Sequence, residues 1–146
     1  VVFLEDARLV QRHREVERGL AAQRGQQRGR TFLRDDLFQD LDREHFLIVL
    51  LSARNTVIGI ETISVGSLNA SIVHPREVFK PAIERSAASV LLSHNHPSGI
   101  PDPSDDDIAL TRRLCQVGEL VGIPVLDHLI CAGSTFYSLK QQGQMP

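Results

Sequence analysis

Residues 93–107 read Ser-His-Asn-His-Pro-Ser-Gly-Ile-Pro-Asp-Pro-Ser-Asp-Asp-Asp and join an apolar run to a helical pattern. Residues 88–96 predict a short buried strand, because Pro and Gly follow it directly. Alternate residues of a strand point to one face, so His94 and His96 are expected side by side. The loop that follows can bring Asp107 back to them. Two imidazoles, one carboxylate and an open position are typical of a catalytic zinc site.

The acidic end of this stretch has a second interpretation that needs no metal. Ser104 and Asp107 have the spacing of a helix capping box, and Asp105 and Asp106 are favourable charges at a helix N-terminus. The two interpretations are compatible for Ser104 and Asp107. We therefore expect Asp105 and Asp106 to be helix-start charges only.

The sequence also resembles a known family. The spacing of His94, His96, Ser104 and Asp107 is similar to the JAMM signature of MPN+ metalloproteases, which is His-x-His, seven residues, Ser, two residues, Asp. The wider sequence resembles the bacterial RadC family, whose catalytic-type domain is a JAMM domain. Three segments carry that resemblance, namely Val-His-Pro-Arg-Glu-Val at 73–78, His-Asn-His-Pro-Ser-Gly at 94–99 and Leu-Asp-His-Leu-Ile at 126–130. It covers roughly residues 32–139.

The resemblance implies a zinc-dependent hydrolase that cleaves a peptide or isopeptide amide of a protein or peptide substrate through a metal-activated water. One Zn²⁺ per chain would be held by His94, His96 and Asp107, and the Ser104 hydroxyl would stabilise the oxyanion. It also implies an upstream glutamate that serves as general base and proton donor. We favour Glu61 for this role, because a carboxylate within an apolar strand is costly unless it is paired or functional. Glu44, where the preceding strand begins, is the alternative.

The remaining patterns predict an α/β fold. Two apolar strands, 45–52 and 57–64, form a hairpin around Asn55, and a helix begins at Pro75. After the strand at 88–96, a helix ends at Gly122 and two strands follow, at 123–132 and 135–139. This order predicts a mixed sheet with helices on both faces, a three-layer α/β/α sandwich. The resemblance implies the cytidine-deaminase-like architecture of JAB/MPN domains.

Charge and composition suggest three parts: a basic helical arm and linker at 1–30, the RadC-like JAMM/MPN+ domain at 31–140, and a loose tail at 141–146. Residues 1–34 hold eight arginines and four acidic residues, whereas the rest is acidic. The arm could contact nucleic-acid phosphates, although neighbouring glutamates at helical spacing favour a solvated helix. A start at Val1 without Met suggests a trimmed or incomplete N-terminus.

The composition favours a cytoplasmic protein. The two cysteines, Cys115 and Cys131, lie outside any metal-binding spacing and suit a reducing compartment. No run is long and apolar enough to span a membrane, and no signal-peptide pattern opens the chain. We therefore expect no membrane partner.

Three rival functions follow from the same residues. A nucleobase deaminase is disfavoured, because it needs His-x-Glu and Cys-x-x-Cys, whereas His94 is followed by His96 and no Cys-x-x-Cys exists. A nuclease or DNA-repair accessory module stays open, since the RadC resemblance carries that association. A non-enzymatic interaction domain that retains the metal site also stays open.

Asp127-His128 either orients a site residue or forms a buried hydrogen-bonded pair.

Overall fold

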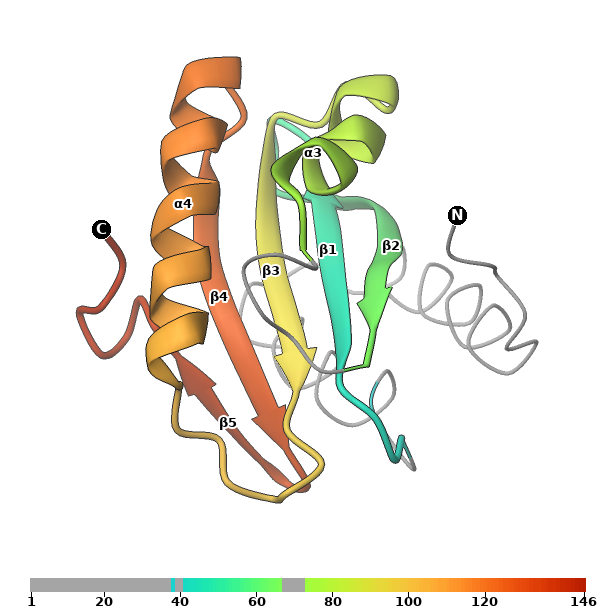
Figure 1. The fold of residues 1–146 in the computed structure, drawn as a ribbon. Coiled ribbons are helices and arrows are strands. Elements are labelled where there is room, and N and C mark those ends of the chain that lie inside the picture. Colours follow the sequence, from blue (N-terminus) through green and yellow to red (C-terminus); the bar gives the residue numbers. More distant parts are fainter. Residues whose placement is uncertain (1–37, 39–40, 67–72) are drawn as a thin grey trace.

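The computed structural model describes residues 38, 41–66 and 73–146, and every structural statement below concerns these residues. The predicted arm at 1–30 lies outside them. The elements, shown in Figure 1, are β1 (His45–Leu51), β2 (Val57–Val65), α3 (Pro75–Glu84), β3 (Ser89–Asn95), α4 (Asp105–Val121), β4 (Val125–Ala132) and β5 (Thr135–Ser138). No helix formed by the described residues is long and apolar enough to cross a bilayer.

The strands form one mixed sheet in the order β2-β1-β3-β4-β5. Only β3 and β4 pair in parallel, and the other neighbours are antiparallel. A parallel pair needs a crossover connection, and α4 supplies it. The β1–β2 hairpin turns at Asn55, whose φ of 57° lies in the left-handed region that Asn tolerates. The predicted α/β class and mixed sheet are confirmed.

Both described helices cover the same face of the sheet, as Figure 1 shows. Their buried apolar residues pack on the strands in one core cluster, whose largest members are Phe46, Ile48, Leu50, Leu92, Phe79, Leu110 and Leu114. A second cluster lies on the opposite face, where β1 and β4 residues pack against Phe38 and Leu41. The sequence also predicts a short helix over residues 35–41, but most of these residues fall outside the described ones.

The helix ends follow the local chemistry that the sequence predicted. α3 begins at Pro75, and His74 caps it by accepting the Arg76 N–H with Nδ1 at 3.3 Å, so His74 has a structural role. α4 ends at Gly122, with φ at 75°. The apolar pattern after Pro75 also predicts Ile83 on the buried face of this helix, and that prediction is wrong, because Ile83 is 58% exposed.

The C-terminal segment is held more firmly than a loose tail would be. The Gln144 N–H donates to the Leu139 carbonyl at 2.8 Å, and the Tyr137 hydroxyl donates to Gln144 Oε1 at 3.0 Å. Leu139 is itself fully buried. These contacts tie the residues after β5 to the edge of the sheet.

Candidate metal centre

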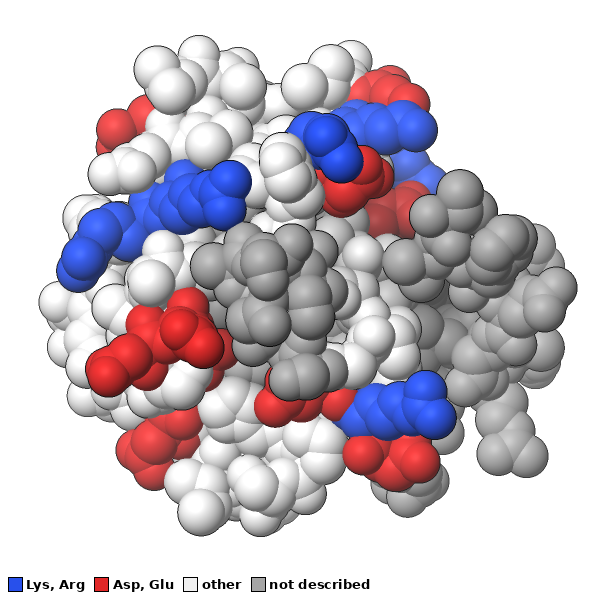
Figure 2. Space-filling model, viewed as in Figure 1, with Lys and Arg blue, Asp and Glu red and all other residues white. Residues whose placement is uncertain are grey.

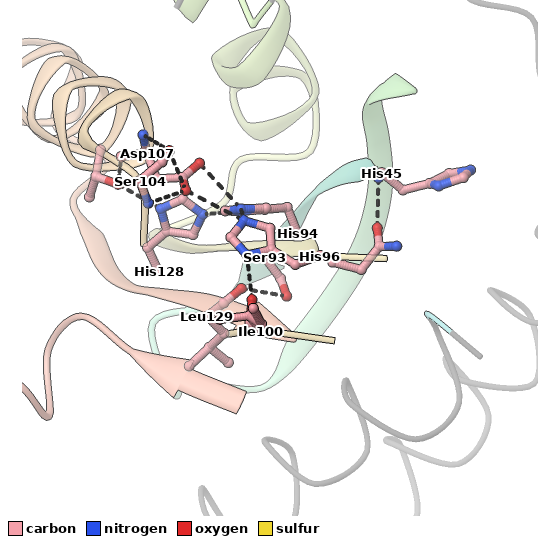
Figure 3. Close-up of polar contacts among 11 residues, drawn as sticks. His45, Ser93, His94, His96, Ile100, Ser104, Asp107, His128 and Leu129 are labelled. Atoms are coloured by element: carbon pink, nitrogen blue, oxygen red, sulfur yellow. Dashed lines mark hydrogen bonds and ion pairs between the residues drawn. The ribbon is translucent and has the colours of Figure 1, made fainter. Parts of the chain in front are cut away.

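The end of β3 and the start of α4 bring three potential metal ligands together (Figure 3). His94 is buried in β3, His96 follows the strand, and Asp107 lies in the first turn of α4. The Nε2 atoms of the two histidines are 2.9 Å apart. Asp107 Oδ1 lies 3.3 Å from His94 Nε2, and its Oδ2 lies 3.5 Å from His96 Nε2. The structure thus unites the predicted ligands.

The spacing of these donor atoms fits a tetrahedral ion. Bonds of about 2.0–2.1 Å, as in zinc sites, place neighbouring ligand atoms about 3.3 Å apart. The three separations given above bracket that value, and all three donors lie within 4.8 Å of one another. Imidazole nitrogen with carboxylate oxygen is a donor set that suits zinc. These three residues therefore could hold a metal ion.

Ser104 and Asp107 form the predicted capping box. The Ser104 hydroxyl and its backbone N–H both donate to Asp107 Oδ2, at 2.7 and 2.8 Å. The Asp107 N–H donates back to Ser104 Oγ at 3.1 Å. Because Oδ2 receives both bonds, the carboxylate is held in one orientation with Oδ1 toward His94. The same hydrogen bonds therefore cap the helix and orient the ligand.

The Asp107 carboxylate and the His96 imidazole each shift the other's pKa toward its charged form. Burial by itself raises the pKa of Asp107, but the imidazoles of His94 and His96 and the Ser104 N–H outweigh it and hold that pKa well below its usual range. The pKa of His96 is raised, first by its interaction with Asp107, against the opposing effect of burial. The Ile100 carbonyl, 2.8 Å from His96 Nδ1, raises it further. A permanent carboxylate thus faces two imidazoles.

Two further acidic side chains lie beside one of the ligands, Asp107, in the first turn of α4. Figure 2 shows red surface over the first turn of α4, where Asp105 and Asp106 are exposed. Both add to the favourable charge at the helix N-terminus, as the sequence predicted. This field attracts cations and repels the phosphates of nucleic acid.

Glu61, the favoured acid–base residue, does not lie with the three ligands. Its Oε1 forms an ion pair with Arg85 Nη2 at 2.5 Å. Gly59 leaves room for this arginine, because a Cβ there would collide with the guanidinium. Glu61 pairs with Ile48 of β1, so two strand spacings, about 10 Å, separate it from β3. Arg85 is therefore the partner that stabilises the carboxylate in this strand.

Glu44, the alternative, lies next to the ligands. The antiparallel β1–β3 ladder ends with the pair Phe46–His94, and Glu44 lies two residues before Phe46 just as His96 lies two residues after His94. The charge of Glu44 raises the pKa of His96, as expected for a nearby carboxylate. The Glu44 carbonyl accepts the Gly66 N–H at 2.8 Å, which fixes its backbone to the end of β2.

His128 is a functional candidate whose role the sequence left open. Its Nε2 lies 2.8 Å from His94 Nδ1, and its ring is fully buried. Burial, followed by the charge of His94, lowers the pKa of His128 well below its usual value. Asp127 accepts the Ser138 hydroxyl at 2.7 Å and the His128 backbone N–H at 2.8 Å. The two adjacent residues are thus hydrogen-bonded through the His128 backbone, while the His128 ring contacts His94.

Comparison with known proteins agrees with this site. Residues 25–144 match the family described as the RadC-like JAB domain. The chain is 61% identical over 105 residues to a UPF0758 protein of Desulforamulus reducens, across 72% of this chain and 46% of that protein. It is 56% identical over 107 residues to a UPF0758 protein of Moorella thermoacetica, across 73% of this chain and 47% of that one.

The mixed sheet and the His/His/Asp cluster define an α/β domain with a possible metal site of the JAB type. The chain belongs to the RadC-like JAB domain family, which confirms the resemblance seen in its sequence. It spans about half the length of the curated relatives that it matches.

Proposed function

We propose that this chain is a zinc-dependent hydrolase that cleaves a peptide or isopeptide amide. The observation that carries the proposal is the convergence of two imidazole nitrogens and one carboxylate oxygen where β3 ends and α4 begins. Zinc, when bound, would supply Lewis-acid chemistry there, lowering the pKa of a bound water and polarising a carbonyl. His94, His96 and Asp107 would hold the ion. The rest of the chemistry belongs to the surrounding side chains.

Glu44 is the acid–base residue in this proposal. It would take a proton from the attacking water and deliver it to the leaving nitrogen. Its position beside His96 supports the role, as does the effect of its charge on that imidazole. Glu61 is engaged with Arg85 instead. In this proposal Glu44, the residue just before β1, is the upstream glutamate that the resemblance implies.

Ser104 has one contact that supports a role in the site. Its hydroxyl donates to Asp107, so it orients a ligand carboxylate. The oxyanion role that the family resemblance implies would require that hydroxyl to turn toward substrate. The Ser104 N–H would continue to hold Asp107 Oδ2 in that state.

Metal content is the first test. The purified chain, dialysed against Zn²⁺ and then against buffer, should retain about one zinc per chain, as a site with three protein ligands does. Asp107→Asn and His96→Ala should both lower that content. A wild-type chain that keeps no zinc contradicts the proposal.

Cleavage of a library of internally quenched peptides, including isopeptide-linked members, is the second test. Glu44→Gln should reduce the rate by about 10²–10⁴-fold while zinc content is unchanged. Glu61→Gln is the matched control and should cleave like the wild type, because its partner is Arg85. Zinc binding without cleavage of any member would instead favour an interaction domain. Salt-dependent DNA binding that disappears on removal of residues 1–30 would favour a nuclease or DNA-repair module.

A further inference from the structure

A buried chain of hydrogen bonds runs from α4 through β4 to the first ligand. The Thr111 hydroxyl donates to the Asp107 backbone carbonyl at 2.6 Å. The same oxygen lies 2.6 Å from His128 Nδ1, and His128 Nε2 lies 2.8 Å from His94 Nδ1. Thr111 is 1% exposed, and both imidazoles are fully buried. Water therefore has no access through which it could replace a member of the chain.

The donor of each hydrogen bond follows in turn from the Asp107 carbonyl, which lies at one end of the chain of bonds. A carbonyl oxygen only accepts, and two oxygens 2.6 Å apart repel unless a hydrogen lies between them, so the Thr111 hydroxyl donates to Asp107. The Thr111 oxygen must then accept a hydrogen from His128 Nδ1. A buried imidazole is neutral and carries one N–H, so His128 Nε2 accepts. Its donor is the Nδ1–H of His94.

We propose that Thr111 and His128 are positioning residues that fix the tautomer of His94. With its hydrogen on Nδ1, His94 presents the Nε2 lone pair to Asp107 and His96, where a metal would bind. A single contact fixes the same tautomer in His96, because its Nδ1 lies 2.8 Å from the Ile100 carbonyl and must donate to it. The inference rests on the proposed metal site, but the tautomer itself exists without metal.

The chain of bonds also links two of the ligands to each other. It begins at the backbone of Asp107, whose carboxylate faces His94, and it returns to the far side of the His94 ring. Metal-binding histidines commonly donate their second N–H to a carboxylate or carbonyl, and loss of that partner costs about 10–100-fold in metal affinity. Here a neutral imidazole and a hydroxyl extend the same contact to a helix carbonyl.

The tautomer is measurable in the metal-free protein by ¹⁵N NMR of labelled imidazole rings. The wild type should show hydrogen on His94 Nδ1 and none on Nε2. Thr111→Val, which removes the hydroxyl and keeps the shape, should populate the other tautomer. A wild-type His94 with its hydrogen on Nε2 overturns the proposal, whether or not the protein binds metal.

Zinc affinity, measured by competition with a chromophoric chelator, is the second readout. Thr111→Val should weaken zinc binding by about 10–100-fold, whereas Thr111→Ser, which keeps the hydroxyl, should restore it. Thr135→Val is the matched control, because it removes a similar bond to the Ala132 carbonyl at 2.9 Å, outside this chain of bonds. Thermal unfolding of each metal-free variant verifies that it is folded. Wild-type zinc affinity in folded Thr111→Val overturns the proposal, whereas a wild type that binds no zinc contradicts the metal site instead.

Discussion

The side-chain amide of Asn95 bridges the two peptide groups that flank Glu44. Its Oδ1 accepts the His45 N–H at 2.7 Å, and its Nδ2 donates to the Arg43 carbonyl at 2.9 Å. Asn95 is only 4% exposed, so these bonds have little competition from water. One residue between the two histidines thus fixes the backbone of the proposed acid–base residue.

Asn95→Ala should reduce peptide cleavage by at least about 10-fold while zinc affinity changes by less than about 3-fold. The reason is that Glu44 loses its positioning, and small displacements of a catalytic group can cost about 10²-fold in rate. Rate and zinc affinity measured on the same preparation test this prediction.

Ser93→Ala is the control for that change. Ser93 is also buried in β3, but its hydroxyl donates to the Leu129 carbonyl at 3.1 Å, on the side away from β1. It should lower stability without lowering the cleavage rate of the folded protein. Equal loss of rate in both variants would mean that Asn95 has a structural role alone.

Ser104→Ala should destabilise the protein by about 0.5–2 kcal/mol, because it removes the N-cap of α4. It should also weaken zinc binding, since Asp107 Oδ2 loses the hydroxyl that orients it at 2.7 Å. Ser104→Thr keeps the hydroxyl and should retain both properties. Urea unfolding and chelator competition measure the two effects, and unchanged zinc affinity in the alanine variant would contradict the orienting role.

Stability of the metal-free protein should fall as the pH falls below about 6.5, the ordinary pKa of histidine. Burial lowers the pKa of His128 in the folded state, so the unfolded state binds more protons in this range. The slope should approach about 1.4 kcal/mol per pH unit. Urea unfolding between pH 7.5 and 5 measures it.

His128→Gln should flatten that slope, because glutamine does not titrate. His96 acts in another window: its raised pKa gives stability that is complete below about 6.5 and is lost as the pH rises through the folded value. Asp107, whose pKa is lowered, loses its contribution only below about 3.9. An unchanged slope in the His128 variant would assign it to other groups.

Gly118→Ala should destabilise the protein although alanine is the better helix former by about 1 kcal/mol. A Cβ at Gly118 would lie 2.7 Å from the Ile123 carbonyl oxygen, and that backbone is fixed by the bond from the Ile123 N–H to the Gly118 carbonyl at 2.9 Å. Overpacking of this kind costs about 1–3 kcal/mol. Gln116→Ala, on the exposed side of α4, is the control and should change stability by less than about 0.5 kcal/mol. A higher melting temperature for Gly118→Ala would contradict the packing argument.

The sequence predicted the features that depend on local chemistry. The capping residues around α4, the turn at Asn55 and the His94/His96/Asp107 group were all readable from spacing, because each involves neighbours along the chain or one short loop. The succession of strands and helices along the chain also followed from the alternation of patterns.

The sequence could not place the acid–base residue, because that depends on register between strands far apart in the chain. An apolar setting drew attention to Glu61, whereas its partner Arg85 comes from the end of α3. The proposal of Glu44 depends on the pairing of Phe46 with His94. The contact between His128 and His94 likewise needs the parallel β3–β4 pairing.

The capping box has a consequence for kinetics. Asp107 Oδ2 closes the first turn of α4 while the same carboxylate faces both histidines. Fraying of that turn would carry the acidic ligand away, and an ion held by all three ligands would resist the fraying. Amide exchange at the start of α4 and dissociation of the ion should therefore report the same local opening, and occupancy should slow both together.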